Sequence, residues 1–222
     1  AGLGLSDLDI DDVEVVGVEA TGWLGDLLDE AVTQRVEPVT APEGFAGELR
    51  PYQQRGVGWL AFLGRLGLGG CLADDMGLGK TAQLIATMLA DPAAGPTLVV
   101  CPVSVLGNWH REIERFAPGL SVQLHHGSER CRENAEEFAQ AATGCDVTLT
   151  TYGLLHRDRE LLEAVRWGRV FLDEAQQIKN SGTKGAQAAR ALATDRRVAL
   201  TGTPVENRLA ELWSIMQFIN PG

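Results

Sequence analysis

A glycine-rich segment at residues 74–81 has the residue types of a phosphate-binding turn. Gly77 and Gly79 let backbone N–H groups converge on phosphate oxygens, and the helix expected to follow directs the positive end of its dipole to the same point. Lys80 supplies a mobile cation, and Thr81 supplies a hydroxyl suited to Mg²⁺. The segment therefore predicts binding of a nucleoside triphosphate together with Mg²⁺.

The same segment departs from the general phosphate-loop pattern at one position. That pattern has a glycine five residues before Gly79, where this chain has Asp74. Taken by itself, the segment is also compatible with a glycine-rich turn that only ends a strand. Its interpretation therefore depends on the rest of the chain.

Two acids, Asp173 and Glu174, directly follow the apolar run 170–172. A carboxylate at this place can hold Mg²⁺ through bound water, while its neighbour orients and deprotonates the attacking water. We therefore assign Asp173 to the metal and Glu174 to the water in hydrolysis of a terminal phosphate. Without the glycine-rich segment, the pair would equally suit a cap on the following turn.

The elements that position these residues follow from the apolar pattern, which alternates short runs with longer amphipathic ones from Leu49 onwards. Strands are expected at residues 70–73, 97–101, 122–125, 146–150, 170–172 and 198–200. Helices are expected at residues 51–65, 80–89, 105–116, 132–141, 154–165, 183–193 and 206–218. Such alternation predicts an α/β fold with a mainly parallel sheet that is covered by helices on both faces.

Residues directly after the strands of an open parallel sheet face one crevice, where ligands bind. Five of the expected strand ends carry polar or proline-containing sequences, at residues 74–81, 102–109, 151–152, 173–176 and 201–204. We expect these segments to meet at one edge of the sheet and to form the site together.

With these segments in place, residues 49–222 resemble the first RecA-like lobe of superfamily-two helicase-like ATPases, specifically the SWI/SNF-type DNA translocases of bacterial type. The resemblance is carried by residues 49–53, 72–81, 173–180 and 200–207. In that family an acidic pair precedes the glycine-rich sequence, so Asp74 is the residue expected at its position.

The resemblance implies roles for individual residues, with ATP and Mg²⁺ as the ligands. Gln53 is implied to read the adenine edge, since an amide offers a donor and an acceptor together. The nucleotide-binding residues are Gln53, Met76, Gly77, Leu78, Gly79, Lys80 and Thr81. Lys80, Asp173 and Glu174 are the implied catalytic residues, and Thr81 and Asp173 the implied metal ligands.

The resemblance also implies residues for coupling and for DNA. The residues that couple nucleotide state to lobe movement are Gln176, Thr201, Gly202 and Thr203, and Gln176 stands where many relatives have histidine. The nucleic-acid residues are Ser104, Asn108, Thr151, Tyr152 and Lys179, which are suited to the strand backbone and not to reading its bases. For Trp109 we favour burial as the core anchor of its helix.

Charge is distributed unevenly along the chain. Residues 1–48 have 12 acids and one base, whereas the remaining residues have 18 of each. We interpret 1–48 as an acidic N-terminal segment and linker, the end of a preceding accessory domain, with an amphipathic stretch at 23–36. We interpret 49–222 as the helicase ATP-binding lobe, whose neutral charge is compatible with a local basic surface for DNA.

Other features limit the cellular context. No apolar run approaches the ~20 residues that span a bilayer, and no signal pattern begins the chain, so we expect a cytoplasmic protein without membrane contact. We also expect a monomer. The four cysteines lack CxxC spacing, which favours reduced thiols. His125 and His126 lack the spacing of a metal site and are expected to satisfy local hydrogen bonds.

The resulting hypothesis is one lobe of a DNA-dependent ATPase that moves along double-stranded DNA and remodels protein–DNA complexes. Because the chain begins without methionine and ends soon after residues 201–204, we expect a longer protein. The resemblance implies that its second RecA-like lobe completes the ATP site. This lobe alone is then weakly active or inactive. Two alternatives stay open: an RNA-directed helicase of the same superfamily, and a nucleotide-dependent interaction module that binds RNA polymerase or another DNA-bound protein.

Overall fold

The computed structural model of the chain describes residues 38–75, 77–91, 95–203 and 209–221. The predicted amphipathic stretch at 23–36 and the predicted nucleotide-binding residue Met76 lie outside these residues. Within the described ranges, no helix has both the length and the apolar character needed to cross a bilayer.

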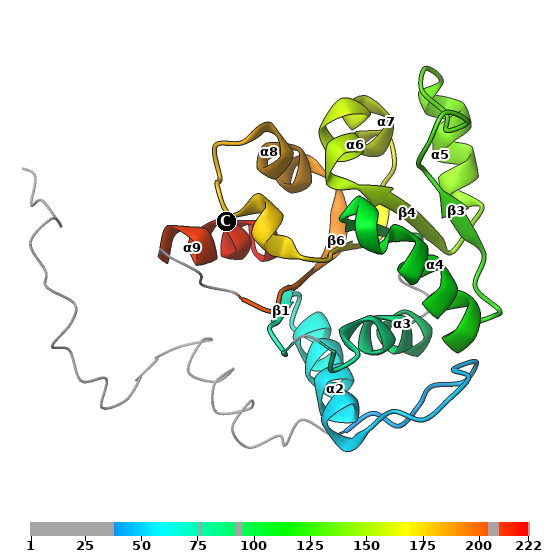
Figure 1. Cartoon of the computed structure of the whole chain (residues 1–222), viewed down its shortest axis with the longest axis vertical. Coiled ribbons are helices and arrows are strands. Elements are labelled where there is room, and N and C mark those ends of the chain that lie inside the picture. The colour runs from blue at the N-terminus through cyan, green and yellow to red at the C-terminus, as the bar shows by residue number, and fades with distance from the viewer. Residues whose placement is uncertain (1–37, 76, 92–94, 204–208, 222) are drawn as a thin grey trace, which may run out of the picture. The chain divides into compact units, whose positions relative to one another are not determined.

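Helices and strands alternate along the described part of the chain (Figure 1). The strands are β1 (Gly70–Leu72), β2 (Thr97–Cys101), β3 (Val122–Leu124), β4 (Val147–Thr151), β5 (Trp167–Leu172) and β6 (Thr194–Leu200). The α-helices are α2 (Pro51–Arg65), α3 (Lys80–Ala90), α4 (Val103–Phe116), α5 (Ala135–Thr143), α6 (Tyr152–Arg157), α7 (Arg159–Glu163), α8 (Lys184–Ala191) and α9 (Leu209–Ile219). A short 3-10 helix, η3 (Ala175–Ile178), follows β5.

The strands in the described residues form one parallel sheet with the order β1-β6-β5-β2-β4-β3. Helices α2, α3 and α4 cover one face, and α5 to α9 cover the other (Figure 1). The structure therefore confirms the predicted α/β class with a parallel sheet between two layers of helices.

The two cores lie on opposite faces of the same strands because successive strand residues point in opposite directions. Val99 and Phe171 pack with residues of α3 and α4, whereas Leu98 and Val170 pack with the helices of the other face. This burial on both faces explains why these strands are continuous apolar runs, without the alternation of a half-exposed strand.

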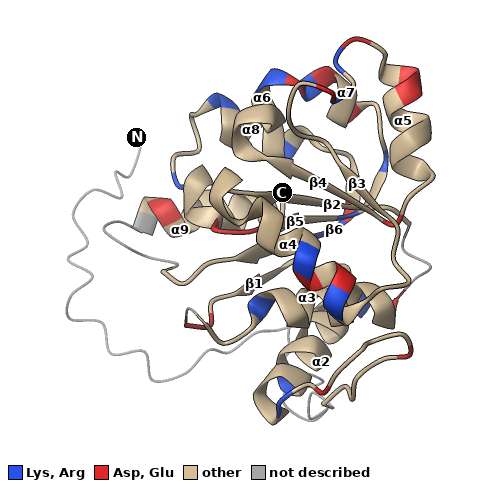
Figure 2. Cartoon of the chain, turned by 45° about the vertical axis from the view of Figure 1, so that its right-hand side comes forward, with Lys and Arg blue, Asp and Glu red and all other residues tan. Residues whose placement is uncertain are grey.

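Strands β5 and β6 begin earlier than predicted, at Trp167 and Thr194. Three arginines near the starts of these strands interrupt the apolar runs from which the strands were predicted, namely Arg169, Arg196 and Arg197. Figure 2 shows that most charged residues of the described part otherwise lie on helices and loops.

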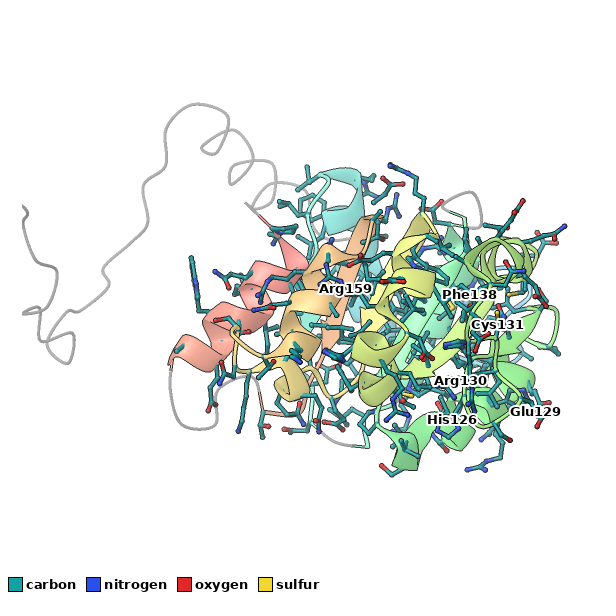
Figure 3. The ribbon with its side chains drawn as sticks, turned by 90° about the horizontal axis from the view of Figure 1, so that it is seen from above. His126, Glu129, Arg130, Cys131, Phe138 and Arg159 are labelled. Atoms are coloured by element: carbon teal, nitrogen blue, oxygen red, sulfur yellow. The ribbon has the colours of Figure 1, made fainter. Side chains whose placement is uncertain are left out.

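The predicted helix at 154–165 is two helices, α6 and α7, which are separated at Asp158. The buried Asp158 carboxylate accepts a hydrogen bond from Arg130 Nε at 2.6 Å and lies 2.9 Å from His125 Nε2. The predicted local hydrogen bonding of His125 is thus confirmed. Arg130 lies beside His126 and Glu129 at one end of the domain (Figure 3). Because His125 and Arg130 both contact the Asp158 carboxylate, Asp158 holds the loop after β3 against the end of α6.

Residues 38–48, part of the predicted linker, pack against the helices. The main-chain N–H of Ala46 donates to Phe116 O at 2.7 Å, and the Phe45 and Phe116 rings stack with centroids 5.3 Å apart. Val39 packs against Leu49 and its neighbours. The division of the chain at residue 48 stays a prediction, but this stretch forms one wall of a cavity near the glycine-rich loop.

Candidate nucleotide site

The glycine-rich loop joins β1 to α3, as the sequence predicted. Gly77 and Gly79 have φ angles of +83° and +71°, a region that glycine enters without steric cost. A Cβ atom on residue 79 would lie 2.5 Å from Gln53 Nε2. Glycine at position 79 is therefore required both by the backbone conformation and by the contact with α2.

The loop is held by two side chains of α2. The carbonyl oxygen of Leu78 accepts hydrogen bonds from the Tyr52 hydroxyl and from Gln53 Nε2, each at 3.1 Å. Gln53 Oε1 accepts from the N–H of Arg50 at 2.9 Å. The amide predicted to read adenine is therefore already engaged, and it ties the start of α2 to the loop.

The Lys80 ammonium group turns back into the loop. Its Nζ donates to the main-chain oxygens of Asp74 and Asp75, the second at 3.1 Å. Asp74, the residue that departs from the general pattern, accepts a hydrogen bond from Gln83 Nε2 of α3 at 3.0 Å. A phosphate group that binds here has to draw Lys80 away from these carbonyl oxygens.

Asp173 directly follows β5, and its oxygen atoms accept three hydrogen bonds. Its carboxylate accepts from Trp109 Nε1 at 2.8 Å and from the main-chain N–H of Glu174 at 2.9 Å. Its carbonyl oxygen accepts from the Tyr152 hydroxyl at 2.8 Å. Burial raises the pKa of Asp173 and the Glu174 charge adds to this, whereas the hydrogen bond from Trp109 acts against it.

Glu174 has φ of 53° and ψ of 55°, and it is the single non-glycine residue in the described ranges with a positive φ. Such a backbone costs of the order of 1–3 kcal/mol and persists where the surrounding structure enforces it, often at functional sites. Glu174 lies between Asp173 and the start of η3, so the main chain turns sharply at the predicted base.

The loop, α4 and the acidic pair line one cavity of about 270 Å³, here called the acidic-pair cavity. Its lining residues are Gly77, Gly79, Lys80, Thr81, Val105, Asn108, Trp109, Glu112, Asp173 and Glu174. The structure thus brings together the predicted strand-end segments after β1, β2 and β5. The hydroxyl-bearing Thr81 and the carboxylate of Asp173 share this cavity, which fits a triphosphate with Mg²⁺.

A second cavity of about 490 Å³, here called the aromatic cavity, adjoins the first and shares Gly77, Gly79 and Glu112 with it. Tyr52 and Gln53 of α2 line it. Phe45, Arg115 and Phe116 also line it, and the Arg115 guanidinium lies 4.9 Å from the centre of the Phe116 ring. Its aromatic and amide groups suit a planar base with polar edges.

The predicted coupling residues form a chain of hydrogen bonds that starts at Glu174. Gln176 Nε2 donates to the Glu174 carboxylate, and the Thr201 hydroxyl donates to Gln176 Oε1 at 2.9 Å. The N–H of Thr203 donates to the Thr201 hydroxyl at 3.1 Å, and Gly202 lies between them. The ends of β5 and β6 are therefore connected through side chains.

The predicted nucleic-acid residues lie in different surroundings. Ser104 and Asn108 are exposed on α4, and Lys179 Nζ lies 3.8 Å from Glu211 Oε1. Thr151 is buried, and the Tyr152 hydroxyl points inward to Asp173, with burial raising its pKa well above the usual value. A DNA contact at 151–152 would therefore use the main chain, and these DNA roles stay predictions.

Sequence reasoning did not assign Tyr52 or Gln83 to the site, and for Trp109 it favoured a position in the core. Trp109 is 1% exposed, which confirms the core position, but its indole N–H also binds Asp173. One signal was available, since a buried tryptophan N–H usually finds a partner.

A parallel α/β domain with a glycine-rich loop between β1 and α3, and an acidic pair after β5, defines a nucleotide-binding domain of the phosphate-loop class. The profile of the SNF2-related domain matches residues 52–222, and the chain belongs to this family. This result confirms the resemblance to SWI/SNF-type ATPases.

Relatives support the same assignment. The chain is 45% identical over 226 residues to a Bacillus subtilis protein, YwqA, whose name describes an ATP-dependent helicase/translocase. The match covers 96% of this chain and 24% of that protein. Helicase SWR1 of Saccharomyces cerevisiae is 42% identical over 191 residues, covering 84% of this chain and 12% of that protein. The chain thus spans a quarter or less of the length of these relatives.

Solved structures agree with the sequence relatives. The SWI2/SNF2 ATPase core of Sulfolobus solfataricus in complex with double-stranded DNA matches with a TM-score of 0.74 and 45% identity. The match covers 82% of this chain and 37% of that one. The same core domain in another solved structure matches with a TM-score of 0.71 and 44% identity.

Proposed function

We propose that this chain is the first ATP-binding lobe of a DNA-dependent ATPase that translocates on double-stranded DNA and displaces proteins bound to it. The observation that carries the proposal is the acidic-pair cavity, where Lys80 of the glycine-rich loop meets Asp173 and Glu174. A hydrogen-bond chain leads from Glu174 through Gln176 to Thr201, which offers a route by which the state of the site reaches β6.

ATP would bind across the two adjoining cavities. The base would occupy the aromatic cavity beside Gln53, and the phosphates would lie over Gly77 and Gly79 in the acidic-pair cavity. The N–H groups at the start of α3 and the Lys80 ammonium group would then bind phosphate oxygens. To do so, Lys80 has to exchange the carbonyl oxygens of Asp74 and Asp75 for phosphate.

Glu174 is the proposed base that orients and deprotonates the attacking water. Asp173 is held by Trp109 and by the Glu174 N–H, so its carboxylate has a fixed direction in the cavity. Asp173 and Thr81 are the residues that would hold Mg²⁺, which when bound neutralises charge on the phosphate oxygens.

The charge of the acidic-pair cavity supports the need for a second lobe. Among the described residues that line it, Lys80 is the one cation, against the carboxylates of Glu112, Asp173 and Glu174. A triphosphate adds more negative charge. Arginines from a second lobe would supply the missing positive charge, and such an arginine is worth ~10³–10⁵ in rate in phosphoryl transfer.

The DNA part of the proposal rests on the relatives. The Sulfolobus solfataricus core that matches this chain was solved with double-stranded DNA. Ser104 and Asn108 are exposed on α4, whose Trp109 contacts Asp173, so a DNA backbone bound along α4 would lie one helix away from the acidic pair.

Nucleotide hydrolysis by a protein with both lobes tests the proposal. Lys80→Ala should abolish nucleotide binding or turnover, because it removes the phosphate-binding cation. Glu174→Gln should retain binding and lose hydrolysis, because it removes the base. Lys184→Ala removes an exposed lysine at the start of α8 and serves as the matched control. Full turnover by Glu174→Gln would contradict the catalytic assignment.

Stimulation by nucleic acid separates the alternatives. We expect duplex DNA to raise turnover more than single-stranded DNA or RNA does. Stimulation by RNA alone would favour an RNA-directed helicase, and no stimulation by any of the three would favour an interaction module. The present chain should turn over much more slowly than the two-lobe protein, and equal rates would contradict the need for a second lobe.

A further inference from the structure

Glu112 of α4 lies where the two cavities of the nucleotide site adjoin. The residues that line both cavities are Gly77, Gly79 and Glu112. Because the two glycines have no side chain, Glu112 supplies the one side chain common to both cavities in the described part of the chain. The proposed metal binding and hydrolysis use Asp173 and Glu174, and they leave the Glu112 carboxylate without a role.

The spacing of residues on α4 places Glu112 on the side of the helix that faces the cavities. The residues of α4 that line the acidic-pair cavity are at positions 105, 108, 109 and 112, and those that line the aromatic cavity are at 112, 115 and 116. Residues three or four positions apart are neighbours on a helix surface, so these positions form one stripe. Glu112 lies in the middle of the stripe.

The Glu112 carboxylate is accessible to a ligand. Its Oε1 atom accepts a hydrogen bond from Asn108 Nδ2 at 3.0 Å, and this bond is exposed. Asn108 also lines the acidic-pair cavity, so the bonded carboxylate lies on the cavity side of α4. The Oε2 atom has no hydrogen bond or ion pair to another described residue. One carboxylate oxygen is therefore open to a donor from a bound molecule.

A further carboxylate beside a triphosphate is unfavourable unless it receives hydrogen bonds, because like charges repel. The hydroxyl groups of a ribose are suitable donors, and an acidic residue binds them in dinucleotide-binding domains. In the proposed binding mode, the base lies in the aromatic cavity and the phosphates lie in the acidic-pair cavity. The ribose joins these two parts of the nucleotide, so it would lie at the junction beside Glu112.

We propose that the Glu112 carboxylate binds the ribose of the nucleotide by accepting a hydrogen bond from its 2′- or 3′-hydroxyl. The inference rests on the proposed function and adds the sugar to the groups that the site recognises. It makes the site selective for ribonucleotides. Because a hydrogen bond to an ionised acceptor is stronger than a neutral one, loss of the hydroxyl should weaken binding about tenfold or more.

Affinities for ADP, 2′-deoxy-ADP and 3′-deoxy-ADP test the inference in the protein with both lobes. These diphosphates have no γ-phosphate to hydrolyse, so calorimetry measures binding alone. We expect the unsubstituted protein to bind ADP about tenfold more tightly than at least one deoxy form. The deoxy form that loses affinity identifies the hydroxyl that Glu112 binds.

Two substitutions of Glu112 are compared with one control. Glu112→Ala should remove the preference, so that ADP and the deoxy form bind equally. Glu112→Gln keeps the size and an acceptor oxygen but loses the charge, so the preference should fall to severalfold. Glu114→Ala is the matched control and should keep the preference, because Glu114 is on the same helix, pairs with His110 and lines neither cavity.

The ratio of dissociation constants decides the outcome, since Glu112→Ala also removes a charge that repels phosphate and so changes the affinity for every nucleotide. Equal binding of ADP and both deoxy forms by the unsubstituted protein overturns the inference. An unchanged preference in Glu112→Ala also overturns it, since another residue would then bind the sugar.

Lys80→Ala separates these results from a failure of the proposed function. Loss of ADP binding in Lys80→Ala places the nucleotide at the glycine-rich loop, whatever the result for the sugar. Undiminished ADP binding by Lys80→Ala would contradict the proposed nucleotide site, and the inference about Glu112 would fall with it.

Discussion

The indole N–H of Trp109 donates a hydrogen bond of 2.8 Å to the Asp173 carboxylate. Trp109 belongs to α4, whose exposed residues Ser104 and Asn108 are proposed to meet DNA, and Asp173 is the proposed metal ligand. Trp109 is also packed in the core, so a displacement of α4 would move the donor that fixes this carboxylate. The contact therefore links the proposed DNA-binding helix directly to the proposed metal ligand.

The link between Trp109 and Asp173 can be tested by a substitution that removes the indole N–H but keeps an aromatic side chain in the core. Trp109→Phe should lower turnover of the two-lobe protein about tenfold, because a hydrogen bond to a charged group contributes ~1.5–3 kcal/mol. The bond opposes the rise in the pKa of Asp173, so its loss should raise that pKa further. The acidic limb of the pH–rate profile should then move to higher pH, since Asp173 has to be ionised to hold Mg²⁺.

Trp167→Phe is the matched control for this experiment. Trp167 is fully buried, and its indole N–H donates to Leu162 O at 2.9 Å, away from the acidic pair. Its substitution should reduce stability without a shift of the acidic limb. Equal changes in the profile of both variants would mean that Trp109 acts through packing alone.

The contact between Thr201 and Gln176 makes a separate prediction about coupling. Thr201→Val keeps the shape of the buried side chain but removes the hydroxyl that donates to Gln176 Oε1. We expect nucleotide binding to be retained and DNA-stimulated turnover to fall about tenfold, because Gln176 then no longer connects Glu174 to β6. Steady-state turnover with and without duplex DNA, together with a nucleotide titration, measures the two effects.

Thr150→Val supplies the comparison for Thr201. Thr150 is also fully buried, and its hydroxyl donates to His125 O at 3.2 Å, outside the chain of hydrogen bonds that joins Glu174, Gln176 and Thr201. This variant should change stability but not the ratio of stimulated to basal turnover. The coupling role is wrong if both variants lower that ratio equally.

The sequence predicted the alternation of elements and the meeting of the strand-end segments because both follow from apolar patterns and parallel topology. It missed the early starts of β5 and β6, where arginines such as Arg169 interrupt the apolar pattern. It also missed contacts between distant residues. Tyr52 and Leu78 are 26 positions apart and Trp109 and Asp173 are 64, and periodicity does not say which donor meets which acceptor.

The hydrogen bond from Tyr52 to Leu78 predicts an effect on nucleotide affinity. The bond holds the loop in the arrangement where Lys80 binds the carbonyl oxygens of Asp74 and Asp75. Tyr52→Phe should release the loop and strengthen nucleotide binding severalfold, since a neutral hydrogen bond contributes ~0.5–1.5 kcal/mol. Titration with a fluorescent nucleotide measures the change. Weaker binding would instead indicate that the hydroxyl contacts the nucleotide.

The buried group of His125, Asp158 and Arg130 predicts how stability depends on pH. Burial lowers the pKa of His125 below 6.5, although Asp158 acts in the opposite direction. Below pH 6.5, His125 therefore binds a proton in the unfolded chain but stays neutral in the folded chain. The free energy of unfolding then falls as the pH falls towards the lowered pKa. Burial also raises the pKa of Asp158, but bonds from Arg130 and His125 outweigh this and hold it below 3.8.

The two effects begin at different pH values as the pH falls, so they can be distinguished. The stability from ionised Asp158 is present above pH 3.8 and is lost as the pH falls through its lowered pKa, whereas the His125 effect begins near pH 6.5. His125→Gln should remove the slope of unfolding free energy between pH 6.5 and 5, at most about 1.4 kcal/mol per pH unit for one proton. Urea unfolding at several pH values measures this slope. His126→Gln alters the next residue and should keep the slope, so a loss of slope in that variant instead would refute the assignment to His125.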